Sequence, residues 1–329
     1  MTYIIAEIGI NHNGKISEAL KLVKIAKKAN ADAVKLQTYD PKQVMIKKLG
    51  KAPYQKKNNK KQNIFDIISK CQLSFADHFK IKKLCRKLNI DLLSSPFDIG
   101  SAKFLIEKIK IYKIKIPSGE ITNYPLLEYL GKKNYPLIIS TGMCNIKEIS
   151  EALSILKKNG HKNEKSLLHC TTSYPTQNSE VNLKAIQTLR KKFKLKIGYS
   201  DHTQGYLAAT GAVSMGAHII EKHITLDNNL EGPDHKASLN PTDFNKFVIK
   251  IKDMQKMLGD GRKKITPSEK RNIIFARKSI IANKNISKGE KFTIKNITTK
   301  RAGSGISAIK WKSILGKKAK KKYYIDEII

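Results

Sequence analysis

Apolar, β-branched runs alternate with segments of helical periodicity through residues 1–260 of this 329-residue chain. The eight runs are Tyr3–Gly9, Ala33–Tyr39, Asp91–Phe97, Tyr112–Ser118, Pro136–Met143, Ser166–Tyr174, Lys196–Thr203 and His218–Ile224. Strands that alternate with helices pair in parallel, because each crossover between parallel strands needs a helix or a long connection. Eight strand–helix units in a segment of this length predict a closed (β/α)8 barrel.

A doubly wound open sheet is the alternative arrangement for the same alternation. Such a sheet typically carries a GxGxxG fingerprint after its first strand, whereas residues 9–14 read GINHNG. The segment that follows has apolar residues at i, i+3, i+4 and i+7, which are Leu22, Ile25, Ala26 and Ala29. It predicts a helix whose N-terminus is capped by Ser17. The barrel is therefore the preferred prediction.

The alternation stops near Gly259. Residues 261–277 are expected to form a linker, and residues 278–329 are expected to form a small domain of short strands and turns. Its expected strands are Ser279–Ala282, Lys291–Ile294 and Ile297–Lys300. A domain of this size is marginally stable by itself, so we expect it to dock onto its own barrel or onto a partner subunit.

The net charge of the chain is +37, from 64 Lys and Arg against 27 Asp and Glu. Binding to nucleic acid is one explanation for such a charge. However, only six of the basic residues are arginines, the residue type best suited to bidentate contacts with bases and phosphates. The lysines are spread along the whole chain, which is typical of solvated surfaces and of an AT-rich coding bias. We therefore expect no nucleic-acid partner, although a basic protein attracts anionic substrates.

The sequence carries no signature of export or of membrane insertion. It contains no run of about 18 uncharged apolar residues, the length that a membrane-spanning helix needs. Its N-terminus lacks the basic and apolar regions of a signal peptide. The four cysteines, Cys71, Cys85, Cys144 and Cys170, form no CxxC pair, which is typical of reduced thiols. We expect a cytoplasmic protein.

Polar residues stand at the ends of the expected strands, where the active sites of (β/α)8 enzymes lie. They include carboxylates, lysines, hydroxyls and imidazoles: Glu7, Lys35, Gln37, Lys115, Ser118, Glu120, Ser140, His169, Thr171, Thr172, Tyr174, Ser200, Asp201, His202, Glu221 and His223. Any one of them could be a structural hydrogen-bonding residue. Together they predict a polar mouth that favours anions.

Two histidines, His202 and His223, end the seventh and eighth expected strands. Neighbouring strands are about 4.8 Å apart, so the two imidazoles are expected to converge. Such a pair suits a divalent metal that keeps open positions for water and substrate, and the alternative is that one or both histidines are structural. Mn2+, Zn2+ and Fe2+ all accept imidazole ligands.

Two lysines, Lys35 and Lys115, are expected inside the barrel, where an unpaired charge is costly. Each could form a Schiff base or bind an anion. A metal beside them offers another way to polarise a carbonyl, which argues against a Schiff base. With the hydroxyls of Ser118, Ser140, Thr172 and Ser200, the lysines predict a cradle for a phosphate and a carboxylate.

Several motifs, taken together, resemble the sialic-acid synthase family. They are Ala6–Gly14 (AEIGINHNG), Val34–Gln37 (VKLQ), Lys115–Glu120 (KIPSGE), Ser140–Met143 (STGM), Gly198–Thr203 (GYSDHT), Glu221–His223 (EKH) and Gly232–His235 (GPDH). Lys300–Ile306 (KRAGSGI) resembles that family's C-terminal antifreeze-like (SAF) domain. The resemblance covers essentially the whole chain, in order. It implies a (β/α)8 barrel followed by a SAF domain.

The resemblance implies an enzyme that condenses phosphoenolpyruvate with the open-chain aldehyde of an N-acylated mannosamine-type sugar, with release of phosphate. The first expectation for the sugar is N-acetylmannosamine, which gives N-acetylneuraminate. The alternatives are 2,4-diacetamido-2,4,6-trideoxymannose, which gives N,N'-diacetyllegionaminate, and the precursor of pseudaminate. The sequence departs from many members in Ala302, where they have proline, and its segment His169–Tyr174 is variable in the family.

Roles for individual residues also follow from the resemblance. Glu7 would be the base, and His202 and His223 would hold Mn2+, with Mg2+ or Co2+ as alternatives. Phosphoenolpyruvate would be bound by Lys35, Lys115, Ser118, Ser140, Thr172 and Ser200. The sugar would be contacted by Gln37, Asn59, Glu120, Tyr174 and Asp234. The family forms homodimers that swap their small domains, and Arg301 would reach into the partner's site.

Another metal aldolase or a deoxyheptulosonate-type synthase would share the barrel and phosphoenolpyruvate, but has no reason to carry the C-terminal domain. A binding protein that used this domain or the lysines would have no need for polar groups at the strand ends.

Overall fold

The computed structural model describes residues 2–47 and 63–329, and within them eight parallel strands close into a barrel in chain order. The strands are β1 (Tyr3–Gly9), β2 (Ala33–Thr38), β3 (Asp91–Pro96), β4 (Ile114–Ile116), β5 (Leu137–Ser140), β6 (Lys165–His169), β7 (Lys196–Asp201) and β8 (Ile219–His223). Each strand overlaps one of the eight expected runs. The predicted (β/α)8 barrel is confirmed, and the open doubly wound sheet is excluded because β1 pairs with both β2 and β8.

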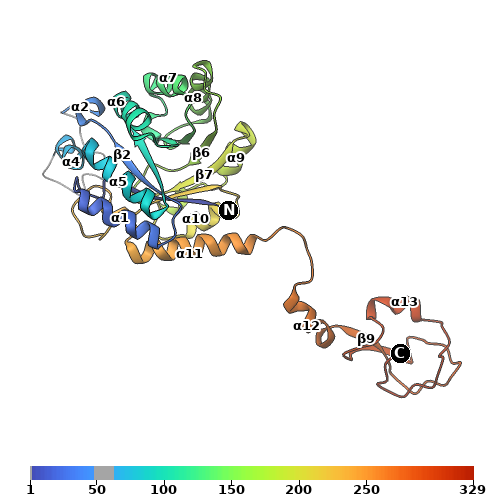
Figure 1. Cartoon of the computed structure of the whole chain (residues 1–329). Helices are drawn as coiled ribbons and strands as arrows, with labels where there is room; N and C mark the ends of the chain where they lie inside the picture. Colours follow the sequence, from blue (N-terminus) through green and yellow to red (C-terminus); the bar gives the residue numbers. More distant parts are fainter. Residues whose placement is uncertain (1, 48–62) are drawn as a thin grey trace. The chain divides into compact units, whose positions relative to one another are not determined.

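The helices lie around the barrel, in the connections between strands and after the last strand, β8 (Figure 1). They are α1 (Ile16–Lys28), α2 (Pro41–Val44), α4 (Ile64–Lys70), α5 (Phe75–Leu88), α6 (Ile99–Lys103), α7 (Tyr124–Lys133), α8 (Ile146–Lys158), α9 (Ala185–Phe193), α10 (Leu207–Ser214) and α11 (Pro241–Leu258). A π-helical segment, Phe104–Ile109, continues α6. Among the described residues, no helix combines the length and the apolar character that crossing a membrane requires.

Helix α1 buries Leu22 and Ala26 as its periodicity predicts, but the expected cap by Ser17 is wrong. The helix begins at Ile16, so Ser17 lies inside its first turn. Lys15 occupies the cap position and makes no side-chain hydrogen bond there. The turn before the helix is instead closed by the backbone, because the Lys15 N–H donates to the carbonyl of His12 over 2.9 Å.

The interior of the barrel is divided into an apolar floor and a polar layer above it. The floor is a separate cluster of buried side chains: Ile5, Ala33, Leu93, Ile138, Leu168 and Ile219. Side chains alternate between the two faces of a strand, so the residue two positions further along points into the barrel again. On β1, β2 and β8 that residue is Glu7, Lys35 and Glu221, respectively. The strand period therefore places charged groups directly above a sealed floor.

The chain divides into two compact units, Met1–Gly259 and Asp260–Ile329. The segment expected as a linker contains a helix, α12 (Pro267–Ala276). Thr266 caps this helix, accepting from the Glu269 N–H, while the Glu269 side chain accepts from the Thr266 N–H over 2.8 Å. The sequence TPSE is this reciprocal cap, with proline at the first helical position.

The second unit contains an antiparallel pair of strands, β9 (Lys278–Ala282) and β10 (Ile297–Arg301), and a short helix, α13 (Trp311–Ile314). Its own core is a cluster of Ile280, Ala282, Ile286, Phe292, Ile297, Ile314, Ala319 and Tyr323. The expected strand Lys291–Ile294 is wrong, because only Lys291 forms an isolated bridge, with Lys318. The chain turns at once: the Thr293 N–H donates to the Asn296 side chain over 2.7 Å.

Candidate active site

A cavity of about 270 Å³ opens above the apolar floor, at the carboxyl ends of the strands. Twelve of the residues that the sequence predicts for the site line it: Glu7, Lys35, Gln37, Lys115, Ser118, Ser140, Thr172, Tyr174, Ser200, His202, His223 and Asp234. They come from loops and strands that are far apart in the chain. The closed barrel brings them together, and their assigned roles stay predictions.

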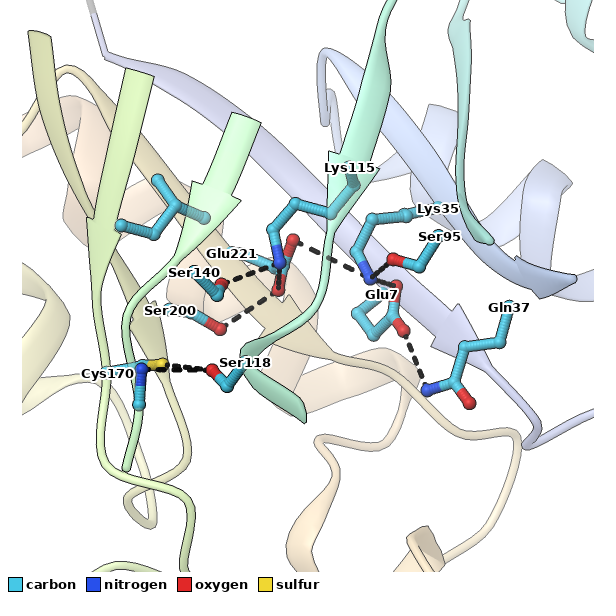
Figure 2. A network of polar contacts seen from close by, with 12 residues as sticks. Glu7, Lys35, Gln37, Ser95, Lys115, Ser118, Ser140, Cys170, Ser200 and Glu221 are labelled. Atoms are coloured by element: carbon cyan, nitrogen blue, oxygen red, sulfur yellow. Dashed lines mark hydrogen bonds and ion pairs between the residues drawn. The ribbon is translucent and has the colours of Figure 1, made fainter. Parts of the chain in front are cut away.

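Glu7 and Lys35 form a buried ion pair on neighbouring strands. Their Cα atoms are register partners, and Lys35 Nζ lies 2.8 Å from Glu7 Oε2. The other carboxylate oxygen of Glu7 accepts a hydrogen bond of 3.3 Å from the Gln37 side chain. Lys35 also donates to Ser95 Oγ over 3.2 Å (Figure 2). The carboxylate is therefore held from two sides, with its charge compensated inside the barrel.

Glu221 lies between the two lysines (Figure 2). Its carboxylate oxygens are 3.6 Å from Lys115 Nζ and 3.8 Å from Lys35 Nζ. Ser200 donates to Glu221 over 2.9 Å, and Lys115 donates to Ser140 over 2.6 Å. Two ammonium groups that converge on one carboxylate in a buried cavity can also bind a substrate that carries several negative charges.

The same environment shifts the pKa values of Glu7 and Glu221 in opposite directions. Burial raises the pKa of Glu7 to about 7, and Lys35 only partly offsets this while Glu221 adds to it. Burial also favours the neutral form of Glu221, but the charges of Lys115 and Lys35 outweigh it and lower the pKa of Glu221 to about 2. Two acids whose pKa values are pushed apart are typical of different roles. Glu7 is able to exchange a proton near neutral pH, whereas Glu221 stays ionised.

A group of hydroxyls and one thiol surrounds Gly142 on the other side of Lys115. Ser118 Oγ accepts from the Gly142 N–H over 3.0 Å and lies 3.2 Å from Cys170 Sγ. The hydroxyl oxygen of Thr172 is buried and has no hydrogen-bond partner within the described part of the chain. A Cβ atom on Gly142 would fall within 3 Å of all three side chains. The absence of a side chain at position 142 therefore leaves room for polar groups that are available to a ligand.

His202 and His223 lie side by side, with ring centroids 5.6 Å apart. The Nδ1 atom of His202 is 2.7 Å from the carbonyl of Thr171, which assigns the proton to Nδ1. The Nδ1 atom of His223 is buried and has no hydrogen-bond partner among the described residues, since its distance of 3.8 Å to Asp234 Oδ2 is too long. Burial lowers the pKa of His202 to about 4 and that of His223 well below its usual value. Both imidazoles are therefore neutral, as a metal ligand must be.

These donors fit a divalent cation with an incomplete protein ligand set. Within residues 2–47 and 63–329, no group of three or more His, Cys, Asp or Glu side chains is arranged to hold a metal ion. Two neutral imidazoles, one with a nitrogen that no described residue binds, would supply two ligands and leave the other positions to water or substrate. The Tyr174 ring covers His202 with centroids 4.2 Å apart, and it limits the space on that side.

In the described part of the barrel, one residue predicted for the site is not part of the cavity lining. Glu120 lies beyond its lining and accepts a hydrogen bond of 2.6 Å from Asn123. Arg301 belongs to the second unit, where it ends β10 and is exposed. Asn59 lies outside the described residues.

Other residues of the cavity were not assigned a role from the sequence. Glu221 stands at the end of an expected strand, yet only the structure shows that it connects both lysines. Ser95 and Cys170 also line the cavity and contact Lys35 and Ser118, respectively. The alternation of β3 carried a signal for Ser95, which stands two positions after Leu93 of the floor.

Comparisons with known proteins agree with the resemblance of the motifs. The chain is 48% identical to the N,N'-diacetyllegionaminic acid synthase of Campylobacter jejuni, an alignment that covers 100% of this chain and 98% of that protein. It is 42% identical to the protein of the same name from Legionella pneumophila, covering 95% of this chain and 89% of that protein. The crystal structure of an N-acetylneuraminic acid synthetase from Leptospira borgpetersenii superposes with a TM-score of 0.71 at 34% identity, covering 83% of this chain and 90% of that chain.

Two family models account for nearly the whole chain. The NeuB family model matches residues 22–263, and the SAF domain model matches residues 277–329. The first match covers most of the barrel, including every strand from β2 to β8. By its motifs, its fold and its relatives, this chain belongs to the NeuB family.

Proposed function

We propose that this protein condenses phosphoenolpyruvate with the open-chain form of an N-acylated amino sugar and releases phosphate. The product is a nine-carbon 2-keto acid. The observation that carries the proposal is the pair of buried ammonium groups beside the pair of neutral imidazoles at the mouth of a NeuB-family barrel. The first pair suits an anion and the second suits a metal-bound carbonyl, so the two reactants would meet in one cavity. Residues 1–260 form the catalytic barrel in this proposal.

Lys35 and Lys115 would bind the phosphate and carboxylate of phosphoenolpyruvate, with hydroxyls completing the cradle. The hydroxyls are those of Ser118, Ser140, Thr172 and Ser200. Glu221 holds both ammonium groups in place before the substrate arrives, at distances of 3.6–3.8 Å. An arriving anion then meets lysines that are already oriented, which reduces the conformational entropy lost on binding.

Glu7 would act as the base toward the water that adds to C2 of phosphoenolpyruvate. Its pKa of about 7 suits proton transfer at neutral pH, because a general base works best when its pKa is near the working pH. Gln37 and Lys35 orient its two oxygens. Proton transfer to Glu7 would leave Lys35 facing a neutral acid, so the ammonium charge would become available to the departing phosphate.

His202 and His223 would hold a divalent cation, for which Mn2+ is our proposal and Mg2+ and Co2+ are alternatives. When bound, such an ion polarises the aldehyde oxygen of the sugar and makes its carbon a better electrophile. The imidazoles would contribute two neutral nitrogen ligands. The hydrogen bond to the Thr171 carbonyl sets the orientation of the His202 ring.

For the sugar we propose 2,4-diacetamido-2,4,6-trideoxymannose, which gives N,N'-diacetyllegionaminate. The two relatives with 48% and 42% identity carry that activity in their names. The wall of the cavity includes Ile10, Ile68, Phe97 and Met143, which suit a sugar with a methyl group and two acetamido groups. N-acetylmannosamine, the first expectation from the sequence, is the second candidate, and the Leptospira structure supports it.

Gln37, Tyr174 and Asp234 line the cavity and would contact this sugar. Glu120 and Asn59 are further proposed contacts. A homodimer with exchanged SAF domains would bring Arg301 of one subunit to the sugar of the other.

The test is phosphate release from phosphoenolpyruvate with a panel of amino sugars. The 2,4-diacetamido-trideoxy sugar, N-acetylmannosamine and the pseudaminate precursor are compared by kcat/KM, with mass spectrometry of the products. A higher kcat/KM for N-acetylmannosamine would overturn the choice of sugar. Absence of phosphate release with every sugar of the panel would overturn the proposed reaction.

A further inference from the structure

A second buried ion pair lies on the outer face of the barrel, behind the two histidines. Asp201 and Lys222 are register partners at the ends of β7 and β8, and Lys222 Nζ lies 2.9 Å from Asp201 Oδ2. Both side chains are 0% exposed. Because side chains alternate along a strand, the pair points away from the cavity that His202 and His223 line. No step of the proposed reaction uses it.

The pair is tied to the turn that carries His202. Asp201 Oδ1 accepts from the Thr203 N–H over 2.9 Å and from the Thr203 hydroxyl over 2.8 Å. Lys222 donates to the carbonyl of Thr203 as well as to Asp201. Phe247 of α11 covers the ammonium group, with 5.9 Å from Nζ to the ring centroid. Lys222, which precedes His223, therefore binds the residues on both sides of His202: the side chain of Asp201 and the main chain of Thr203.

The pair also stands at the point where the pairing of β7 and β8 ends. The paired register of β7 and β8 runs Tyr199–Ile220, Ser200–Glu221 and Asp201–Lys222, and it ends there. The next residue on each chain is a histidine. Beyond the ion pair their main chains are bound elsewhere, because the carbonyl of His202 accepts from Thr176 and that of His223 from Leu239. The ion pair is thus the last direct connection between the two strands before the imidazoles.

Stability alone does not account for charges at this position. A buried ion pair loses so much hydration that an apolar pair of similar size is often equally stabilising. Outward-facing residues on other strands of the barrel, such as Ala6, Leu36 and Ile139, are apolar and belong to the main core. An ion pair differs from such a contact in being directional, which suits the control of register and distance.

We propose that Asp201 and Lys222 are positioning residues that set the mutual placement of the His202 and His223 rings. The placement of the two rings does not depend on a bound metal. The effect of the ion pair on metal affinity rests on the proposed function. Residues that orient metal ligands typically change metal affinity by about 10- to 100-fold when they are removed.

The test uses the full-length double variant Asp201→Leu/Lys222→Met, which leaves no unpaired buried charge. The matched control is Asp253→Leu/Lys256→Met, which removes an exposed ion pair of 3.7 Å on α11. Thr203→Val is a milder variant that removes one hydrogen bond to Asp201 without changing any charge. Far-UV circular dichroism establishes that each variant is folded, and Thr203→Val decides the question if the double variant is not.

Two readouts separate this proposal from the proposed function. Long-range 1H–15N correlation spectra of the chelator-treated enzyme report the tautomer of each histidine, independently of metal and of turnover. The wild type should show His202 protonated on Nδ1, and the double variant should lose this single tautomer. Visible absorption during a Co2+ titration should give an affinity about 10- to 100-fold weaker in the double variant. The shift should be smaller in Thr203→Val and absent in the control.

Wild-type-like histidine signals and a Co2+ affinity within twofold of the wild type, in a folded double variant, would overturn the positioning role. If the wild type itself binds no Co2+, the metal part of the proposed function fails. In that case the tautomer spectra still decide whether the pair positions the rings.

Discussion

A single methyl group at position 142 should weaken phosphoenolpyruvate binding without unfolding the barrel. Gly142 does not belong to the glycines with a left-handed backbone, so alanine is compatible with its conformation. The added Cβ atom would lie 2.3 Å from Thr172 Oγ1, 2.8 Å from Ser118 Oγ and 2.9 Å from Cys170 Sγ. All three atoms are ends of side chains that can rotate away. The strain in Gly142→Ala therefore falls on the proposed anion cradle.

The loss of affinity for phosphoenolpyruvate can be estimated from the hydrogen bonds that these side chains would lose. Favourable contacts to carbon lie at about 3.5–4.0 Å, so the Thr172 hydroxyl must move by roughly 1 Å or more. We expect this to cost the hydrogen bonds that Thr172 and Ser118 would make to the ligand, at about 0.5–1.5 kcal/mol each. A total of about 1–3 kcal/mol corresponds to a loss of roughly 5- to 150-fold in affinity.

The assay is isothermal titration of phosphoenolpyruvate into the enzyme, with KM from phosphate release as a second measure. Gly119→Ala is the matched control, because Gly119 lines the same cavity but a Cβ there would meet nothing within 4 Å. We expect its affinity to stay close to that of the wild type. If Gly142→Ala binds phosphoenolpyruvate as tightly as Gly119→Ala, the hydroxyls around Gly142 do not hold the substrate.

Three further predictions concern the metal, the base and the dimer. His202→Ala and His223→Ala should abolish metal-dependent turnover in a folded protein, and Mn2+ or Co2+ should restore wild type inactivated by EDTA; full activity after exhaustive chelation would contradict this. Since a base must be unprotonated and burial raises the pKa of Glu7 to about 7, kcat/KM should rise between about pH 6 and about pH 8, and a flat profile would argue against Glu7. Arg301→Ala should lower kcat/KM about 10- to 150-fold, from the loss of a charge-assisted hydrogen bond. Mixing it with Glu7→Ala subunits should regenerate activity in one site of each heterodimer, and no recovery despite subunit exchange would place the action of Arg301 within its own subunit.

The barrel could be predicted from the sequence because its signals are local and repeated. Each strand is a short apolar run, and longer helices such as α1 carry an apolar period of their own, so the alternation can be recognised without long-range information. In the second unit, the strand predicted at Lys291–Ile294 is wrong. There the hydrogen bond from Thr293 to the Asn296 side chain favours a turn over the β propensity of the residues.

A site residue could be predicted where its position along a strand determines whether its side chain points into the barrel. Glu7, Lys35 and Lys115 follow from the alternation within single strands. The role of Glu221 depends on its distances to two lysines on other strands, and these are fixed only by closure of the barrel. Glu120 shows the opposite case, because the short 3-10 helix Ser118–Glu120 directs it toward Asn123 instead of the cavity.

The apolar floor of the barrel has a consequence for the order of events during turnover. Along β8 the residues rise from Ile219 in the floor, through Glu221 beside the lysines, to His223 nearer the rim. A molecule on the lysines therefore lies deeper than one on the imidazoles, and the floor closes any exit below it. If the lysines bind the anion and the imidazoles bind the sugar, as proposed, the anion would have to enter first and the sugar second. Initial-rate kinetics should then follow a compulsory order, in which excess sugar slows access of the anion to the empty enzyme.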